Sequence, residues 1–204
     1  MIRSVSAIAC GILSLVSIAC VGGRPIHYYV IDHPVITEAA AKPGGIALLV
    51  GRISTPEALQ DNRILYRAVG NEVGAYEYHR WRERPALIVQ DFLLETLRAS
   101  GKYRQVQEAS TAATGDYLIR GKLYEFSEID TEGIQTRVSL HLELLDRKSG
   151  LLIWNRQYNH DEPVNGKKME EVIVSMQHNL QRVIADAASG IDQVLSNRGE
   201  GATR

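Results

Sequence analysis

Histidines are the side chains of this sequence that could act as general bases or as metal ligands. The six are His27, His33, His79, His141, His160 and His178. No two are four residues apart, so the HExxH zinc pattern does not occur. His160 stands beside Asp161 and Glu162, but adjacent residues in a turn cannot all point at one ion. We therefore expect no metal site.

Motifs that would indicate catalysis or nucleotide binding are also absent from the sequence. A G-x-S-x-G motif, which positions the nucleophilic serine of many hydrolases, does not occur. The glycine-containing stretch at residues 70–74 lacks the lysine and the following helix that a phosphate-binding loop needs. We therefore expect neither enzymatic activity nor a bound cofactor.

The thiol of Cys20 is placed for a different reaction, the attachment of a lipid. Arg3 supplies a positive charge, residues 5–19 form a largely apolar run, and Ala19 puts a small side chain before Cys20. This order is typical of a secretory signal. A cysteine directly after the cleaved bond accepts a diacylglyceryl group in bacterial lipoproteins. We predict such a lipid on Cys20, with an uncleaved anchor or an ordinary signal peptide as the alternatives.

Cysteine content and charge restrict the environment and the partners. After removal of residues 1–19, Cys20 would be the only cysteine left, so no thiol would remain for disulfides. The net charge of −1 and the absence of a basic block argue against nucleic acid as a partner. We predict a signal peptide at 1–19, a lipidated tether at 20–26, a single domain at 27–197 and a disordered tail at 198–204.

Hydrophobic patterns in the first half of the domain predict strands, a hairpin and one helix. Residues 27–32 indicate an edge strand, and the apolar run 46–53 indicates a strand buried on both faces. Residues 64–69 and 72–78 indicate a hairpin. Pro85 then opens a helix with an apolar stripe that ends near Gly101.

The second half of the domain predicts a meander followed by a long helix. Residues 134–144 alternate strictly between apolar and polar, with antiparallel partners expected at 117–126 and 151–158. From Lys167 onward, apolar residues recur at spacings of three and four, which favours a helix on the sheet over a coiled coil. The predicted fold is α+β: a mainly antiparallel sheet with two principal helices packed on one face.

Several motifs in the middle of the chain carry a family resemblance. Residues 59–67 read L-x-D-x-x-I-L-Y-R, and residues 76–85 read Y-x-Y-x-x-W-x-E-x-P. Together with Cys20 and the YYVID strand at 28–32, they resemble the auxiliary lipoprotein family of ABC-type transport systems. These are the PqiC-type lipoproteins that accompany MCE-domain lipid transporters.

The resemblance implies a role without catalysis. Such lipoproteins are anchored in the outer membrane and dock a periplasmic MCE assembly, whose ABC permease and ATPase are separate chains. Val21 is not the aspartate that retains lipoproteins at the inner membrane in enteric bacteria, so we expect the periplasmic face of the outer membrane. The alternatives are another envelope-biogenesis or secretion lipoprotein and a lipid-anchored periplasmic hydrolase. A homo-oligomer is compatible with each.

Five residues of the resembling segment are candidates for the partner interface: Tyr66, Tyr76, Tyr78, Arg80 and Trp81. Tyrosine, tryptophan and arginine dominate interface hot spots, but aromatic pairs also fill the edge of a core across a hairpin. Strand alternation predicts that Tyr76 and Tyr78 share a face. We expect Trp81 to be structural, and Arg80 with one of the tyrosines to face the partner.

Overall fold

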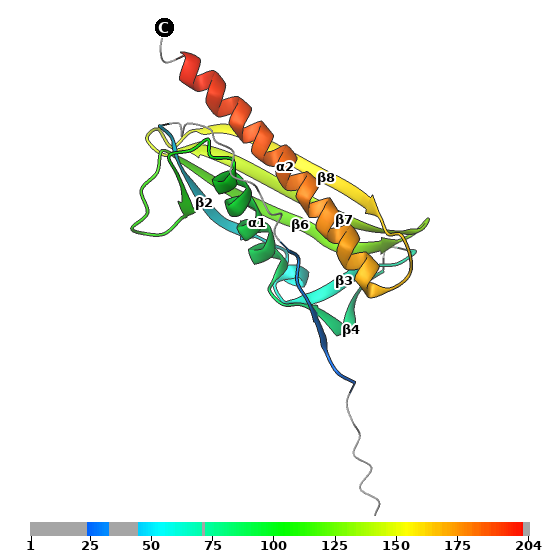
Figure 1. The fold of residues 1–204 in the computed structure, drawn as a ribbon. Helices are drawn as coiled ribbons and strands as arrows, with labels where there is room; N and C mark the ends of the chain where they lie inside the picture. Colours follow the sequence, from blue (N-terminus) through cyan, green and yellow to red (C-terminus); the bar gives the residue numbers. More distant parts are fainter. Residues whose placement is uncertain (1–23, 33–44, 71, 202–204) are drawn as a thin grey trace, which may run out of the picture.

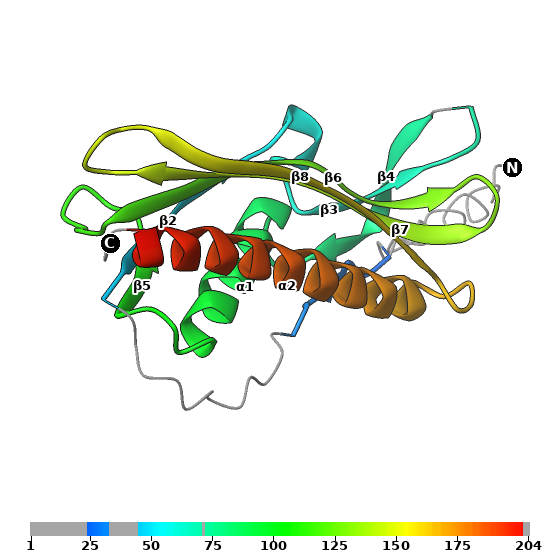
Figure 2. The same ribbon diagram turned by 90° about the horizontal axis from the view of Figure 1, so that it is seen from above.

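An eight-stranded sheet carries two helices on one of its faces (Figure 1, Figure 2). The computed structural model describes residues 24–32, 45–70 and 72–201, so the predicted signal peptide and Cys20 lie outside the described residues. The elements are β1 (His27–Tyr29), β2 (Ala47–Ser54), η1 (Glu57–Leu59), β3 (Arg63–Arg67), β4 (Val73–Trp81), α1 (Pro85–Ala99), β5 (Gln105–Glu108), β6 (Tyr117–Asp130), β7 (Ile134–Asp146), β8 (Leu152–Pro163) and α2 (Met169–Gly201). The α+β prediction is confirmed.

The meander β6–β7–β8 forms the long part of the sheet, as the sequence predicts. Both of its pairings are antiparallel and extend over most of each strand. Alternate residues of β7 are fully buried, among them Val138, Leu140 and Leu142. The turn after β7 is closed by Asp146, whose carboxylate accepts backbone N–H groups of Lys148 and Ser149, both at 2.9 Å.

Strand β6 has partners on both of its edges. One edge pairs with β7 along most of its length. The other edge pairs in parallel with β2 in its first half and with β3 in its second half. The sheet therefore branches at β6 into an arm of β2 and β5 and an arm of β3, β4 and β1. Most paired residues are antiparallel, but the sequence patterns did not predict these shorter parallel pairs.

The two short arms agree with the patterns that predicted their strands. Strand β2 lies between β5 and β6, so Ala47 to Val50 are buried, as the continuous apolar run indicates. Strands β3 and β4 form the predicted hairpin. Among the described strands β1 pairs with β4 alone, which confirms that it is an edge strand, and the pairing is parallel and three residues long.

Both helices cover the same face of the sheet, α1 over β2 and α2 over β7 and β8 (Figure 2). Helix α1 has Pro85 in its first turn, and Gly101 follows its end with a φ of 63°. The polar residue Gln90 of this helix is buried, and its amide donates to Glu108 of the neighbouring strand β5 at 3.1 Å.

Helix α2 buries the apolar stripe that predicted it. Ile173, Met176 and Leu180 lie in the core, and Gly190 approaches the sheet so closely that an added Cβ would lie 3.1 Å from Trp154. The helix continues to Gly201, past residue 197 where we placed the end of the domain. Backbone hydrogen bonds can extend a helix past its last apolar residue.

Buried polar contacts fix the position of α2 on the sheet. Asn179 is fully buried, and its amide donates to the carbonyl oxygens of Thr136 at 2.8 Å and His160 at 3.1 Å. The hydroxyls of Thr136 and Ser175 are 2.9 Å apart. Since an unpaired buried amide would cost about 1–3 kcal/mol, these contacts select one register of the helix on β7 and β8.

Candidate functional site

The structure separates the five candidate interface residues into three places. Trp81 lies in the core with no exposed surface, and its ring packs edge-on against Phe126 with 5.4 Å between centroids. Its indole nitrogen has no hydrogen-bond partner among the described residues. Trp81 therefore has the structural role that we expected, and it cannot contact a partner directly.

Tyr66 and Tyr76 lie together across the β3–β4 hairpin. Their ring centroids are 5.1 Å apart, and both side chains are half-buried. The Tyr66 ring covers Gly74, its cross-strand neighbour, so closely that a Cβ there would lie 2.4 Å from the ring. An aromatic ring over a glycine of the facing strand stabilises the pair and fixes its register. Gly74 is thus the residue that allows Tyr66 to lie flat on the sheet.

The hydroxyl of Tyr76 donates to the carboxylate of Glu128 on β6. The Tyr76 oxygen lies 2.9 and 3.0 Å from the two carboxylate oxygens. Only 6 % of Glu128 is exposed, and this burial raises the pKa of its carboxyl, although the Tyr76 hydrogen bond acts in the opposite direction. Burial and the Glu128 charge also raise the pKa of Tyr76. The tyrosine therefore remains a donor at any physiological pH.

His79 connects these tyrosines to the edge strand β1. Its Nδ1 atom is 2.8 Å from the hydroxyl of Tyr29. Its ring stacks on His27 with centroids 5.5 Å apart and meets the edge of Tyr76 at 5.8 Å. We call these residues the ring cluster: Tyr29, Tyr66, Tyr76, His27, His79 and the supporting Glu128. It joins the β3–β4 hairpin to β1 and β6.

The expected alternation along β4 does not hold between Tyr76 and His79. These two rings contact each other, although residues three positions apart in a regular strand point to opposite faces. The pairing of β3 with β4 shifts at this point, so β4 has extra residues that change its face. Beyond the shift, Tyr78 and Arg80 lie on the face of β4 opposite to His79, and so do not join the ring cluster.

Tyr78 and Arg80 each contact residues outside the ring cluster. Arg24 lies over the Tyr78 ring, 5.8 Å from its centroid. The guanidinium of Arg80 donates to the Asn62 side chain at 3.5 Å, and its Nε has no partner among the described residues. The structure therefore does not bring the five candidate residues together in one patch, because the register shift in β4 separates Tyr76 from Tyr78 and Arg80.

Replacement of Glu128 by glutamine should remove one contribution to the dependence of stability on pH. Since the folded state raises the pKa of Glu128, it binds this proton more tightly than the unfolded chain, so stability falls as the pH rises above about 4.3. Glu128→Gln stays neutral and keeps an acceptor for Tyr76. We expect the variant to gain stability relative to the original protein between about pH 4 and pH 7 in urea unfolding.

The comparison between the two proteins removes the contribution of other carboxyls. Hydrogen bonds from Arg137 lower the pKa of Asp161, which makes stability rise with pH, but this effect is common to both proteins. Curves of unfolding free energy against pH that run parallel for Glu128→Gln and the original protein would contradict the prediction.

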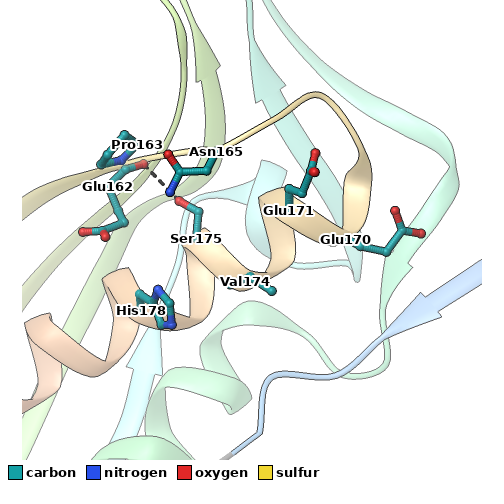
Figure 3. Close-up of a pocket in the computed structure, with 8 residues that line it drawn as sticks. All are labelled: Glu162, Pro163, Asn165, Glu170, Glu171, Val174, Ser175 and His178. Carbon is teal, nitrogen blue, oxygen red and sulfur yellow. Dashed lines mark hydrogen bonds between the residues drawn. The ribbon is translucent and has the colours of Figure 1, made fainter.

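A surface cavity of about 230 Å³ lies beside the first turns of α2 (Figure 3). Three of its six polar lining residues have structural partners. Glu171 accepts the backbone N–H of Lys168 at 2.8 Å, and the hydroxyl of Ser175 donates to the carbonyl oxygen of Glu162 at 3.0 Å. The carboxylate of Glu162 pairs with Arg182 at 3.2 Å. The serine is thus held by the sheet rather than activated by the lining residue His178.

The described part of the chain has neither a cluster of metal-ligating side chains nor a membrane-spanning helix. Within residues 24–32, 45–70 and 72–201, no three histidine, cysteine, aspartate or glutamate side chains gather closely enough to hold a metal ion. In the same part of the chain, no helix combines the length and the apolar character needed to cross a membrane.

Comparison with known proteins shows a family match and similar solved folds. A family model described as "ABC-type transport auxiliary lipoprotein component" matches residues 29–188. A crystal structure of a protein from Xanthomonas campestris has a TM-score of 0.77 and 17 % identity, covering 85 % of this chain and 99 % of that one. A second crystal structure, of an uncharacterized protein, has a TM-score of 0.65 and 15 % identity, covering 82 % and 99 %. No curated protein matches significantly.

Proposed function

Because this chain belongs to the family of ABC-type transport auxiliary lipoprotein components, we propose that it is a non-enzymatic docking component of a transport system. In this proposal a lipid on Cys20 holds the domain on the periplasmic face of the outer membrane. The domain binds a periplasmic MCE protein that works with an ABC permease and ATPase. The family match over residues 29–188 is the observation that carries the proposal.

The position of the family match supports an anchored domain. It begins nine residues after Cys20 and extends into α2, so the matched part is the folded domain rather than the leader. A diacylglyceryl thioether with an amide-linked third acyl chain buries many methylene groups, each contributing about 0.8 kcal/mol. Such an anchor would hold the domain at one membrane without a transmembrane helix.

We propose the exposed rim of the ring cluster as the docking surface for the MCE protein. Tyr66 and Tyr76 are half-buried, and Gly74 and Glu128 hold them in fixed orientations. Aromatic side chains that are already ordered lose little conformational entropy on binding, which favours them as hot spots. Neither Trp81, which is buried, nor Tyr78, which lies on the other face, belongs to this surface.

The test is co-purification from detergent-solubilised membranes. We expect the lipidated chain to recover an MCE-domain protein, and Tyr66→Ala to reduce that recovery by about tenfold or more, as a hot-spot truncation does. Tyr124→Ala is the matched control, because Tyr124 is an exposed tyrosine of β6 outside the ring cluster. Melting curves of both variants show whether the fold is retained.

Two results would contradict the proposal in different ways. Recovery of an envelope-assembly protein in place of an MCE protein would assign the chain to another system. Equal recovery by Tyr66→Ala and Tyr124→Ala, with an MCE protein present, would leave the function in place and exclude the ring cluster as its docking surface.

A further inference from the structure

The strand nearest to the lipidation site has an apolar outer face. Ile26, Tyr28 and Val30 are 44 %, 59 % and 42 % exposed. The alternate positions turn the other way, since Tyr29 joins the ring cluster and Ile31 lies in the core. Three consecutive outward positions are thus apolar and in contact with water, which is unusual for an edge strand because such strands are generally protected by charge or proline.

Strand β4 extends this surface. Tyr28 is the register partner of Arg80, so the two side chains leave the parallel pair on the same face. Arg24, one further outward position before Ile26, lies over the ring of Tyr78. We call Arg24, Ile26, Tyr28, Val30 and Tyr78 the outer stripe. It combines an apolar centre with tyrosine hydroxyls and a guanidinium at one end.

We propose that the outer stripe lies on the phospholipid surface into which the lipid of Cys20 inserts. This inference rests on the proposed anchor. Ile26 is six residues after Cys20, and a chain extends at most about 3.6 Å per residue, so Ile26 cannot be more than about 22 Å from the acylated sulfur. The sulfur itself lies at the level of the headgroups. The outer stripe is therefore the described part of the domain that the anchor holds closest to the bilayer.

The composition of the outer stripe fits the interface between water and acyl chains. Tyrosine is enriched at this level because its ring is apolar and its hydroxyl remains hydrated. Arginine can reach lipid phosphates while its methylenes cover apolar surface. Arg24 is the member nearest to Cys20 in the chain, so its charge lies where phosphates are densest. A protein partner on the stripe would have to enter the short gap between the domain and the membrane.

A single thiol at position 28 tests the proposal in the full, lipidated chain. Apart from Cys10 and Cys20 the sequence has no cysteine, so Tyr28→Cys gives a unique free thiol once the signal is cleaved and Cys20 is acylated. The thiol receives an environment-sensitive fluorophore, and the protein is reconstituted in phosphatidylethanolamine–phosphatidylglycerol vesicles. Leu151→Cys is the matched control: Leu151 is 64 % exposed and lies in the β7–β8 turn, far from β1 (Figure 1).

We expect headgroup-labelled nitroxide lipids to quench the fluorophore at position 28 several-fold more than the one at 151, and aqueous iodide to show the reverse order. Equal iodide quenching at both positions, with the acyl chains on Cys20 confirmed by mass spectrometry, would overturn the inference and leave the anchor in place. A non-acylated Cys20 would overturn both. Protection of position 28 without vesicles, or only after addition of an MCE protein, would assign the stripe to a second copy or to the partner and would also overturn it.

Discussion

Trp81→Ala should lower the free energy of unfolding by about 3–5 kcal/mol, the cost of truncating a large aromatic side chain in a core. Trp81 has no exposed surface and packs against Phe126 of β6, so it joins the β4 arm to the long strands. Alanine would leave a cavity that the paired backbone of β4 cannot close. For a domain of this size the melting temperature should fall by roughly 6–20 °C.

Two further substitutions show whether the loss of stability comes from the missing ring of Trp81. Trp81→Phe should retain most of the stability, since the indole nitrogen has no hydrogen-bond partner among the described residues and the ring contact with Phe126 is preserved. Tyr28 pairs with Arg80, the residue before Trp81, and its side chain is exposed on β1. Tyr28→Ala should therefore change stability by less than about 0.5 kcal/mol. A melting temperature for Trp81→Ala within 2 °C or so of the original value would show that the side chain is not a core residue.

Cys20→Ala should remove the protein from the outer-membrane fraction. Without the thiol no thioether can form, so the chain either remains as an unprocessed precursor or appears as soluble periplasmic protein. A single acyl chain already gives only marginal membrane binding, and the variant has none. Fractionation followed by mass measurement of the N-terminal peptide distinguishes these two products.

The second cysteine provides an internal control for that experiment. Cys10 also follows an alanine, but too little apolar sequence precedes it to form a signal, so Cys10→Ala should keep the same membrane association and the same processed mass. If Cys20→Ala and the original protein stay in the outer-membrane fraction with N-terminal peptides of equal modification, the lipoprotein interpretation is wrong.

Local patterns were sufficient to predict the elements that pack on both sides of the core. Strict alternation in β7 and the spacing of apolar residues in α2 each follow from burial of one face, and both were confirmed. The parallel pairs of β6 with β2 and β3 could not be predicted in this way. They join strands separated by long stretches of sequence, and nothing in either strand's own pattern specifies its neighbour.

At the candidate site, too, local patterns did not predict contacts between residues of different strands. Trp81 was expected to be structural because aromatic side chains can fill the edge of a core across a hairpin, and the structure places it in the core. The grouping of Tyr76 with Tyr78 failed at the register shift in β4, since one uneven pairing reverses the face of every later residue. His79 and Glu128 had no signal of their own, because they meet Tyr76 only through the assembled sheet.

The branching of the sheet at β6 also determines how the domain responds to force on its tether. Amide hydrogens of β6 are enclosed between β7 on one edge and β2 or β3 on the other, so their exchange with deuterium should require opening of the whole sheet. Strand β1 is held by only three residue pairs at an edge and should exchange by local opening. A pulling force transmitted from the bilayer would therefore detach β1 from β4 first. The released strand would lengthen the tether while the rest of the domain remains folded.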